Sequence, residues 1–218
     1  MENKRKYLAS LICLGIFVVF TILVKAVDVQ QIGPLGSSVG FAALNGSVAK
    51  ALPFNEAAYK ITQFMGYIAL LVCCAFAAVG LAQLIKTQDI KAVDKRITSQ
   101  GVFYVIVIAL YVFFEKVVIN YRPVDMGEGL EASYPSSHTM LVICVMATAV
   151  LQIGWLVKSR RLKITLDLLC LLFMILMIVG RIISGVHWIT DIVAGLLISA
   201  ALLLAFSGVL DRLEENEA

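Results

Sequence analysis

The chain contains two histidines, His138 and His187, and both stand among other polar residues. Asp191 follows His187 by four residues, a spacing that places both side chains on one face of a helix. A carboxylate bonded to one imidazole nitrogen fixes the tautomer and leaves the other nitrogen free to attack an electrophile. Guanidinium groups, such as those of Arg122 and Arg181, bind phosphate through parallel N–H donors. These residue types indicate phosphoryl chemistry.

Ser136 and Ser137 stand directly before His138, at the start of a long apolar run. Serine caps helices, and the free N–H groups at a helix N-terminus also bind anions, so we predict a seat for phosphate here. A serine nucleophile with a histidine base is the weaker interpretation, because neither serine stands in a G-x-S-x-G turn.

Metal binding is a second alternative, because acidic residues lie between and after the histidines. Asp125, Glu128, Glu131 and Asp191 could in principle join both histidines around zinc. Their spacing matches no compact zinc site, however, and neighbouring arginines would repel a cation. We therefore expect no metal and no other cofactor, and we interpret the first three acids as solvated loop charges.

The elements that must position these residues are membrane-spanning helices. Of the 218 residues, 61% are hydrophobic and only 15% are charged, which indicates an integral membrane protein. A helix needs about 20 apolar residues to cross the hydrocarbon of a bilayer. Six segments meet this requirement, near 7–27, 61–85, 101–120, 138–157, 164–183 and 189–210. We predict an all-α polytopic membrane protein with six transmembrane helices in one bundle, forming a single domain over residues 1–218.

The distribution of positive charge predicts the orientation of the spans. Twelve of the 18 Lys and Arg residues fall in the N-terminal segment, the second–third and fourth–fifth connections and the C-terminal tail. Positive charge favours the cytoplasmic face, so both termini are expected inside the cell. The polar groups around Arg122, His138, Arg181 and His187 then converge on the outer side. Alone, an interfacial arginine or histidine is commonly a membrane anchor, but this convergence favours a site.

The long connection over residues 28–60 is Gly-rich and half apolar. It fits either a segment lying on the membrane surface or a packed loop.

Three sequence motifs resemble those of the type 2 phosphatidic acid phosphatase family, the membrane lipid phosphate phosphatases related to vanadium haloperoxidases. The family pattern K-x6-R-P, P-S-G-H and S-R-x5-H-x3-D is matched by Arg122-Pro123 with Lys116 upstream, by PSSH at 135–138 and by GRIISGVHWITD at 180–191. The resemblance covers the last four spans, about residues 101–210, and six spans is also the plan of that family.

The sequence departs from the family pattern at three positions. Lys116 precedes Arg122 by six residues instead of seven, and Glu115 takes the expected place of the lysine. Seven residues return nearly to the same helix face and six fall about 100° short of that position, so the contact of Lys116 with phosphate stays open. Ser137 replaces a glycine, and Gly180 replaces a serine and lacks its hydroxyl.

The resemblance implies a mechanism for the remaining residues. His187 would attack phosphorus and form a phosphohistidine, while Asp191 orients it. His138 would protonate the leaving oxygen and then activate water. Arg122 and Arg181, with Lys116 as a further candidate, would bind the phosphate oxygens together with the N–H groups of Ser136, Ser137 and His138.

The expected activity is hydrolysis of a lipid phosphate or diphosphate in the plasma membrane, with the site on the extracytoplasmic side. Candidate substrates are a polyprenyl diphosphate such as undecaprenyl diphosphate, phosphatidate and phosphatidylglycerophosphate. Two alternatives are a lipid phosphotransferase using the same site and a non-enzymatic phospholipid-binding protein or transporter. The expected partners are a membrane lipid and the bilayer, with no nucleic acid; the sequence does not predict the oligomeric state.

Overall fold

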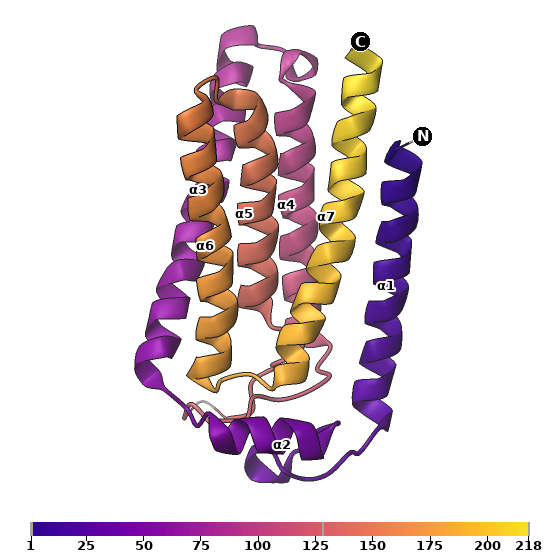
Figure 1. The fold of residues 1–218 in the computed structure, drawn as a ribbon, viewed down its shortest axis with the longest axis vertical. Coiled ribbons are helices and arrows are strands. Elements are labelled where there is room, and N and C mark those ends of the chain that lie inside the picture. Colours follow the sequence, from indigo (N-terminus) through magenta and orange to yellow (C-terminus); the bar gives the residue numbers. More distant parts are fainter. Residues whose placement is uncertain (1, 128, 218) are drawn as a thin grey trace.

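The computed structural model describes residues 2–127 and 129–217, and helices joined by irregular connections make up this part of the chain (Figure 1). The α-helices are α1 (Glu2–Ala26), α2 (Ala42–Ala51), α3 (Glu56–Thr87), α4 (Lys95–Lys116), α5 (Ser137–Leu156), α6 (Arg160–Ser184) and α7 (Ile189–Glu217). Two short 3₁₀ helices, η1 (Pro34–Gly36) and η2 (Ile90–Ala92), lie in connections. The predicted all-α fold is therefore confirmed.

Six of these helices are long and apolar enough to cross a membrane, as the sequence predicted. They are α1, α3, α4, α5, α6 and α7. The predicted third span, near 101–120, was wrong at its C-terminal end, since α4 covers Lys95–Lys116. Residues 117–120 are apolar enough to continue a span in composition, but the chain leaves the helix at Val117 and turns toward Asn120.

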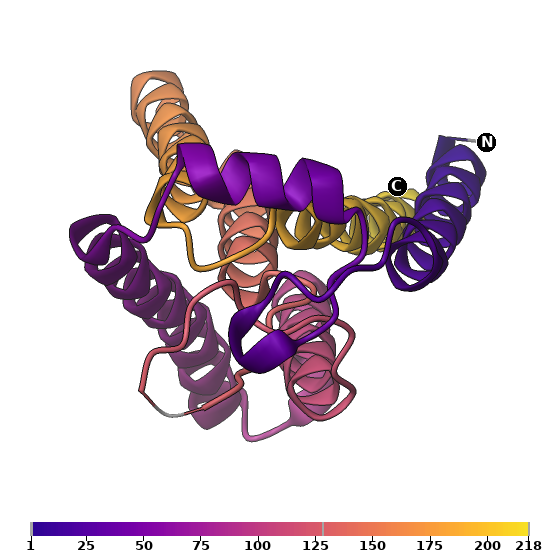
Figure 2. The same ribbon diagram turned by 90° about the horizontal axis from the view of Figure 1, so that it is seen from below.

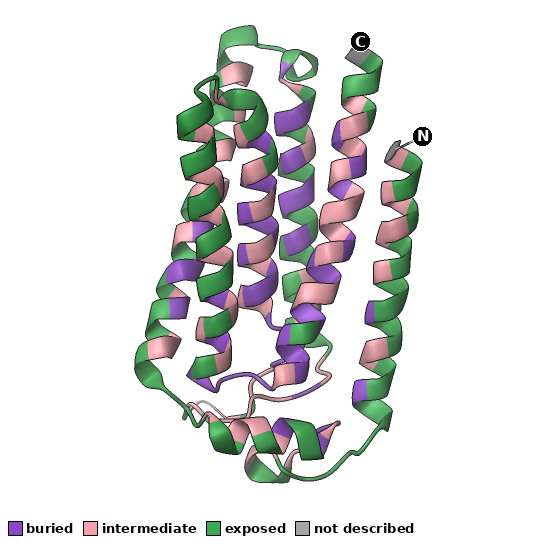
Figure 3. Ribbon diagram, viewed as in Figure 1, coloured by how far each residue is buried: buried purple, intermediate pink, exposed green. Residues whose placement is uncertain are grey.

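Helix α5 lies at the centre of the bundle and is the most buried of the spans. It contacts α3, α4, α6 and α7, whereas α1 packs chiefly along α7 at the edge (Figures 1 and 2). The outer faces of α1 and α6 are largely exposed (Figure 3). Many of the exposed residues on α1, α3 and α6 are apolar. That reversal of the usual polar surface is what a lipid environment requires.

Both termini lie at one end of the bundle, and α2 lies across the other end (Figures 1 and 2). Asn45 on α2 donates a 3.0 Å hydrogen bond to Thr190 Oγ1, and the Asn55 N–H donates to the Ser184 carbonyl at 3.0 Å. The 28–60 connection is thus a helix-containing segment packed on the bundle end. It forms hydrogen bonds to both helices that flank the α6–α7 turn, at Ser184 of α6 and Thr190 of α7.

Candidate active site

The turn between α6 and α7 carries His187. Helix α6 ends at Ser184, and Gly185 follows with φ 65° and ψ 14°, the left-handed conformation that favours glycine. A Cβ at this position would lie 2.9 Å from the Leu52 carbonyl oxygen, so the close approach also demands glycine. Helix α7 begins at Ile189, which leaves His187 in the turn and Asp191 in the first turn of the next helix.

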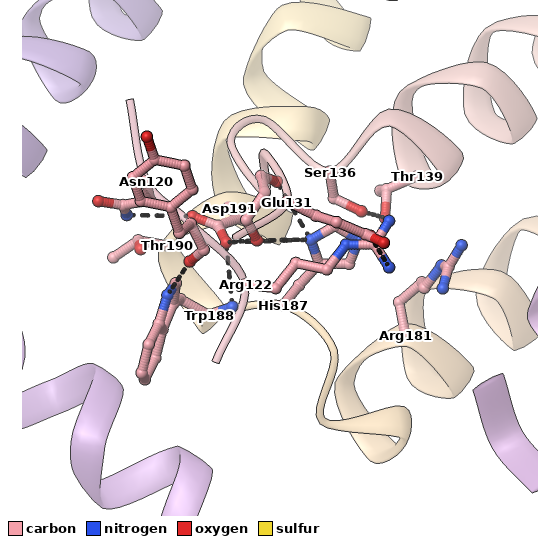
Figure 4. A network of polar contacts seen from close by, with 12 residues as sticks. Asn120, Arg122, Glu131, Ser136, Thr139, Arg181, His187, Trp188, Thr190 and Asp191 are labelled. Carbon is pink, nitrogen blue, oxygen red and sulfur yellow. Dashed lines mark hydrogen bonds and ion pairs between the residues drawn. The ribbon is translucent and has the colours of Figure 1, made fainter. Parts of the chain in front are cut away.

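Ser133 lies between the imidazole of His187 and the carboxylate of Asp191. His187 Nδ1 is 3.0 Å from Ser133 Oγ and 3.1 Å from the Ser133 carbonyl oxygen, but 3.9 Å from Asp191 Oδ2. The Ser133 hydroxyl donates to Asp191 Oδ2. His187 and Asp191 lie close together (Figure 4). The direct carboxylate–imidazole hydrogen bond that we expected is replaced by a link through the Ser133 hydroxyl.

The Asp191 carboxylate is fully buried and fixed by further donors. The Trp188 N–H donates to Oδ2 at 3.0 Å, and Asn120 Nδ2 donates to Oδ1 at 3.3 Å. These contacts draw the loop after α4 and the turn before α7 onto one carboxylate. Asp191 therefore fixes the position of the surrounding loops in addition to that of His187.

The other imidazole nitrogen, His187 Nε2, is buried and has no hydrogen-bond partner among the described residues. Burial, and then the nearby charges of Arg181, Arg122 and His138, lower the pKa of His187 well below its usual value. At neutral pH the ring is therefore uncharged. With Nδ1 engaged by Ser133, the free electron pair is on Nε2, which suits a nucleophile.

Arg181 is a buried cation with two unused donors. Arg181 is only 1% exposed to solvent. Its Nη2 donates to Gln63 Oε1 at 2.8 Å, and its guanidinium lies 5.7 Å from the centre of the Tyr59 ring. Nε and Nη1 have no partner, and within the described chain no carboxylate forms an ion pair with Arg181. A buried charge without a counter-ion is costly, so this geometry suits a site completed by an anion.

Arg122 is paired with Glu131. Arg122 Nη1 lies 2.8 Å from Glu131 Oε2, and the Arg122 N–H donates to the Glu131 carbonyl at 3.0 Å. Arg122 Nε is buried without a partner. The interpretation of Glu131 as a merely solvated charge was wrong, while Asp125 is exposed and accepts from the Gly127 N–H at 2.8 Å. Glu128 lies outside the described residues.

The N-terminus of α5 brings His138 toward the site. Ser136 is buried, and its N–H donates to the Asp191 carbonyl at 2.9 Å, so this donor is already engaged. Ser137 and His138 stand in the first turn of α5, where N–H groups lack intrahelical partners. His138 packs against α3 at Gly66, where an added Cβ would lie 2.9 Å from His138 Cδ2.

A cavity of about 400 Å³ extends from His138 between α3, α4 and α5. Its lining is mostly apolar, with Gln63, Tyr67 and Tyr111 as polar groups. Lys116, the last residue of α4, is exposed and forms no ion pair within the described chain. The structure thus gathers both histidines, both arginines and Asp191, but it gives Lys116 no contact with them.

Sequence reasoning missed Ser133 and Gln63, which contact His187 and Arg181. Ser133 stands only three residues before Ser136, so its place beside the PSSH motif was a usable signal. Gln63 is a polar residue inside an apolar span, which in membrane proteins commonly marks a functional site.

Comparisons with known proteins give two similarities, one of sequence and one of fold. The sequence model of the PAP2 superfamily matches residues 113–214. Among solved structures, the fold resembles the crystal structure of a transmembrane PAP2 type phosphatidylglycerolphosphate phosphatase from Bacillus subtilis, with a TM-score of 0.61 and 15% sequence identity. The match covers 94% of this chain and 96% of the other. No curated protein matched the sequence.

Proposed function

We propose that this chain, whose residues 113–214 match the model of the PAP2 superfamily, is an integral membrane phosphatase acting on a lipid phosphate or diphosphate. One observation carries the proposal. Two buried groups at the same end of the bundle lack a partner among the described residues: the Nε and Nη1 donors of Arg181, and Nε2 of His187. A phosphate group would supply both the missing counter-ion and the electrophile.

The proposed reaction has two steps. His187 Nε2 attacks phosphorus as the bond to the leaving oxygen breaks, and His138 gives that oxygen a proton. His138 then takes a proton from water, whose oxygen attacks the phosphohistidine and releases phosphate and free His187. Arg122 and Arg181 stabilise the charge on the phosphate oxygens throughout, which is the main demand of phosphoryl transfer.

The cavity beside His138 supports a lipid as the substrate. Its walls come from the membrane-spanning helices α3, α4 and α5, and the lining is mostly apolar. A prenyl or acyl chain could lie there while its phosphate reaches the arginines. Polyprenyl diphosphates such as undecaprenyl diphosphate, phosphatidate and phosphatidylglycerophosphate all have this form.

We propose that the site faces the extracytoplasmic side of the plasma membrane and that both termini are cytoplasmic. The termini lie at the bundle end opposite the site (Figure 1), and that end also carries most of the positive charge. Labelling of cysteines introduced next to the termini, in intact and permeabilised cells, tests this orientation. Labelling of intact cells would contradict it.

We also propose that the reaction needs no metal, because the guanidinium groups supply the positive charge. Within the described chain, no group of three or more His, Cys, Asp or Glu side chains could hold a metal ion. Activity should survive a chelator. Loss of activity that magnesium or zinc restores would contradict this part of the proposal.

A phosphate-release screen tests the function directly. Purified protein is assayed with polyprenyl diphosphates and glycerolipid phosphates, alongside His187→Ala and Arg181→Ala. Arg160→Ala is a suitable control, since Arg160 is exposed at the other end of α6. We expect release by the wild type and the control only. Release by His187→Ala would remove the nucleophile; phosphate appearing on an added lipid acceptor would indicate a transferase, and no turnover of any lipid would favour a binding protein or transporter.

A further inference from the structure

The hydrogen-bond chain behind His187 contains a hydroxyl where a direct carboxylate contact was expected. Ser133 is buried and 2% exposed, and its Oγ lies 3.0 Å from His187 Nδ1. The same hydroxyl donates to Asp191 Oδ2, which is 3.9 Å from Nδ1 and beyond hydrogen-bond distance. The carboxylate therefore reaches the imidazole only through Ser133.

The directions of these hydrogen bonds follow from the number of protons available. The carboxylate of Asp191 only accepts hydrogen bonds, so the Ser133 hydroxyl donates its one proton to the carboxylate. The lone pairs of Ser133 Oγ then face Nδ1, and the Ser133 carbonyl oxygen, 3.1 Å from Nδ1, is also an acceptor. Both contacts favour the tautomer with a proton on Nδ1 and a free electron pair on Nε2.

The backbone of Ser133 is fixed by a hydrogen bond that does not involve its hydroxyl. Its N–H donates to the carbonyl of Asn120 at 2.9 Å, and the side chain of the same Asn120 contacts Asp191. The loop carrying Ser133 therefore keeps its anchor when only the hydroxyl is removed. This separation allows the role of the hydroxyl to be tested alone.

We infer that Ser133 is a positioning residue that relays the negative charge of Asp191 to His187 Nδ1. The inference rests on the proposed function, because the relay would act in the step in which Nε2 of His187 gains a phosphoryl group. At that moment the ring becomes positively charged, and Nδ1–H donates more strongly to a hydroxyl already polarised by a carboxylate. The relay thus stabilises the ring most when it is phosphorylated.

Removing the hydroxyl should slow phosphorylation without weakening phosphate binding. For Ser133→Ala we expect kcat to fall by about 10- to 100-fold, the effect of losing one hydrogen bond to a charged group, with KM nearly unchanged. Ser133→Thr, which keeps a hydroxyl, should recover most of the rate. Ser199→Ala is the matched control, since Ser199 is a fully buried serine on α7 whose hydroxyl bonds a main-chain carbonyl.

A merely structural role predicts a different pattern. In that case Ser133→Ala would lower thermal stability and lose the stabilisation that inorganic phosphate gives through Arg122 and Arg181. Ser133→Thr would then fail to restore the rate. Full activity of Ser133→Ala, in an active wild-type protein, would overturn the relay while leaving the phosphatase function intact.

Imidazole NMR tests the relay even if no substrate is turned over. In a His138→Gln background, His187 is the one remaining histidine of the chain. We expect the Nδ1–H proton of His187 to shift upfield in Ser133→Ala, because one of its two acceptors is lost and only the Ser133 carbonyl oxygen remains, and to stay in place in Ser199→Ala. An Nδ1–H resonance that Ser133→Ala leaves unchanged would overturn the inference.

Discussion

Replacing Arg181 by methionine is expected to abolish activity and, at the same time, to make the fold more stable. Arg181 offers two unused donors, Nε and Nη1, to the substrate phosphate. Each hydrogen bond to a charged group contributes roughly 1.5–3 kcal/mol. The loss of both should therefore lower kcat/KM by about 10²- to 10⁴-fold, at 1.4 kcal/mol per factor of ten.

The gain in stability comes from removing a buried charge that no carboxylate neutralises. Desolvation costs several kcal/mol for a buried ion, and Gln63 and the Tyr59 ring return only part of this. We expect a net gain of about 2 kcal/mol, or roughly 4–8 °C in Tm for a chain of this size. Methionine is apolar, unbranched and flexible, so it can fill the space.

Phosphate release and thermal unfolding in detergent measure the two effects on the same preparations. Arg181→Lys keeps the charge but not the fork of donors, so it should lose activity without the gain in stability. Arg160→Met, at the exposed end of α6, should change neither property. An Arg181→Met protein that is less stable than wild type, or that retains activity, would refute the reasoning.

Three further predictions concern the histidines and two close glycine contacts. The folded protein holds the pKa of His187 below that of the unfolded chain, so stability should fall as pH drops below about 6.5. The melting temperature of His187→Gln should fall less steeply with pH, and an identical dependence on pH in both proteins would contradict this. Gly66→Ala should displace His138 and lower kcat by about tenfold or more, since the added Cβ would lie 2.9 Å from its ring; unchanged turnover would mean that the ring can give way. Gly180→Ser should destabilise the bundle by about 1–3 kcal/mol because its Cβ would meet Thr62 Cγ2 at 2.6 Å, and adding Thr62→Ser should restore the melting temperature; a stable single variant would contradict the clash.

The sequence predicted the spans well because the bilayer leaves few alternatives. A segment of about 20 apolar residues in lipid must satisfy its own backbone, so composition alone indicates a helix. The alternation of spans then places the loop carrying Arg122 and the turn carrying His187 at one end of the bundle, where the structure has them. Composition did not reveal where α4 stops, because residues 117–119 are apolar and the first polar residue after α4 is Asn120.

The finer contacts depend on tertiary packing, which sequence spacing does not encode. The spacing of His187 and Asp191 predicted one helix face for both, whereas His187 lies in the turn before α7 and only Asp191 is helical. The spacing also could not show that a serine from another loop separates them. Gln63 reaches Arg181 only because α3 packs against α6. The pairing of Glu131 with Arg122 likewise depends on the fold of the loop between α4 and α5.

The most direct test of the proposed mechanism is to locate phosphate on the protein during turnover. A lipid substrate labelled in its phosphate is mixed with enzyme, quenched within milliseconds under alkaline conditions, and the labelled peptide is identified by mass spectrometry. We predict phosphate on His187 in the wild type and no labelled protein in His187→Ala. Phosphate on another residue, or rapid turnover with no labelled protein at any time, would contradict the mechanism.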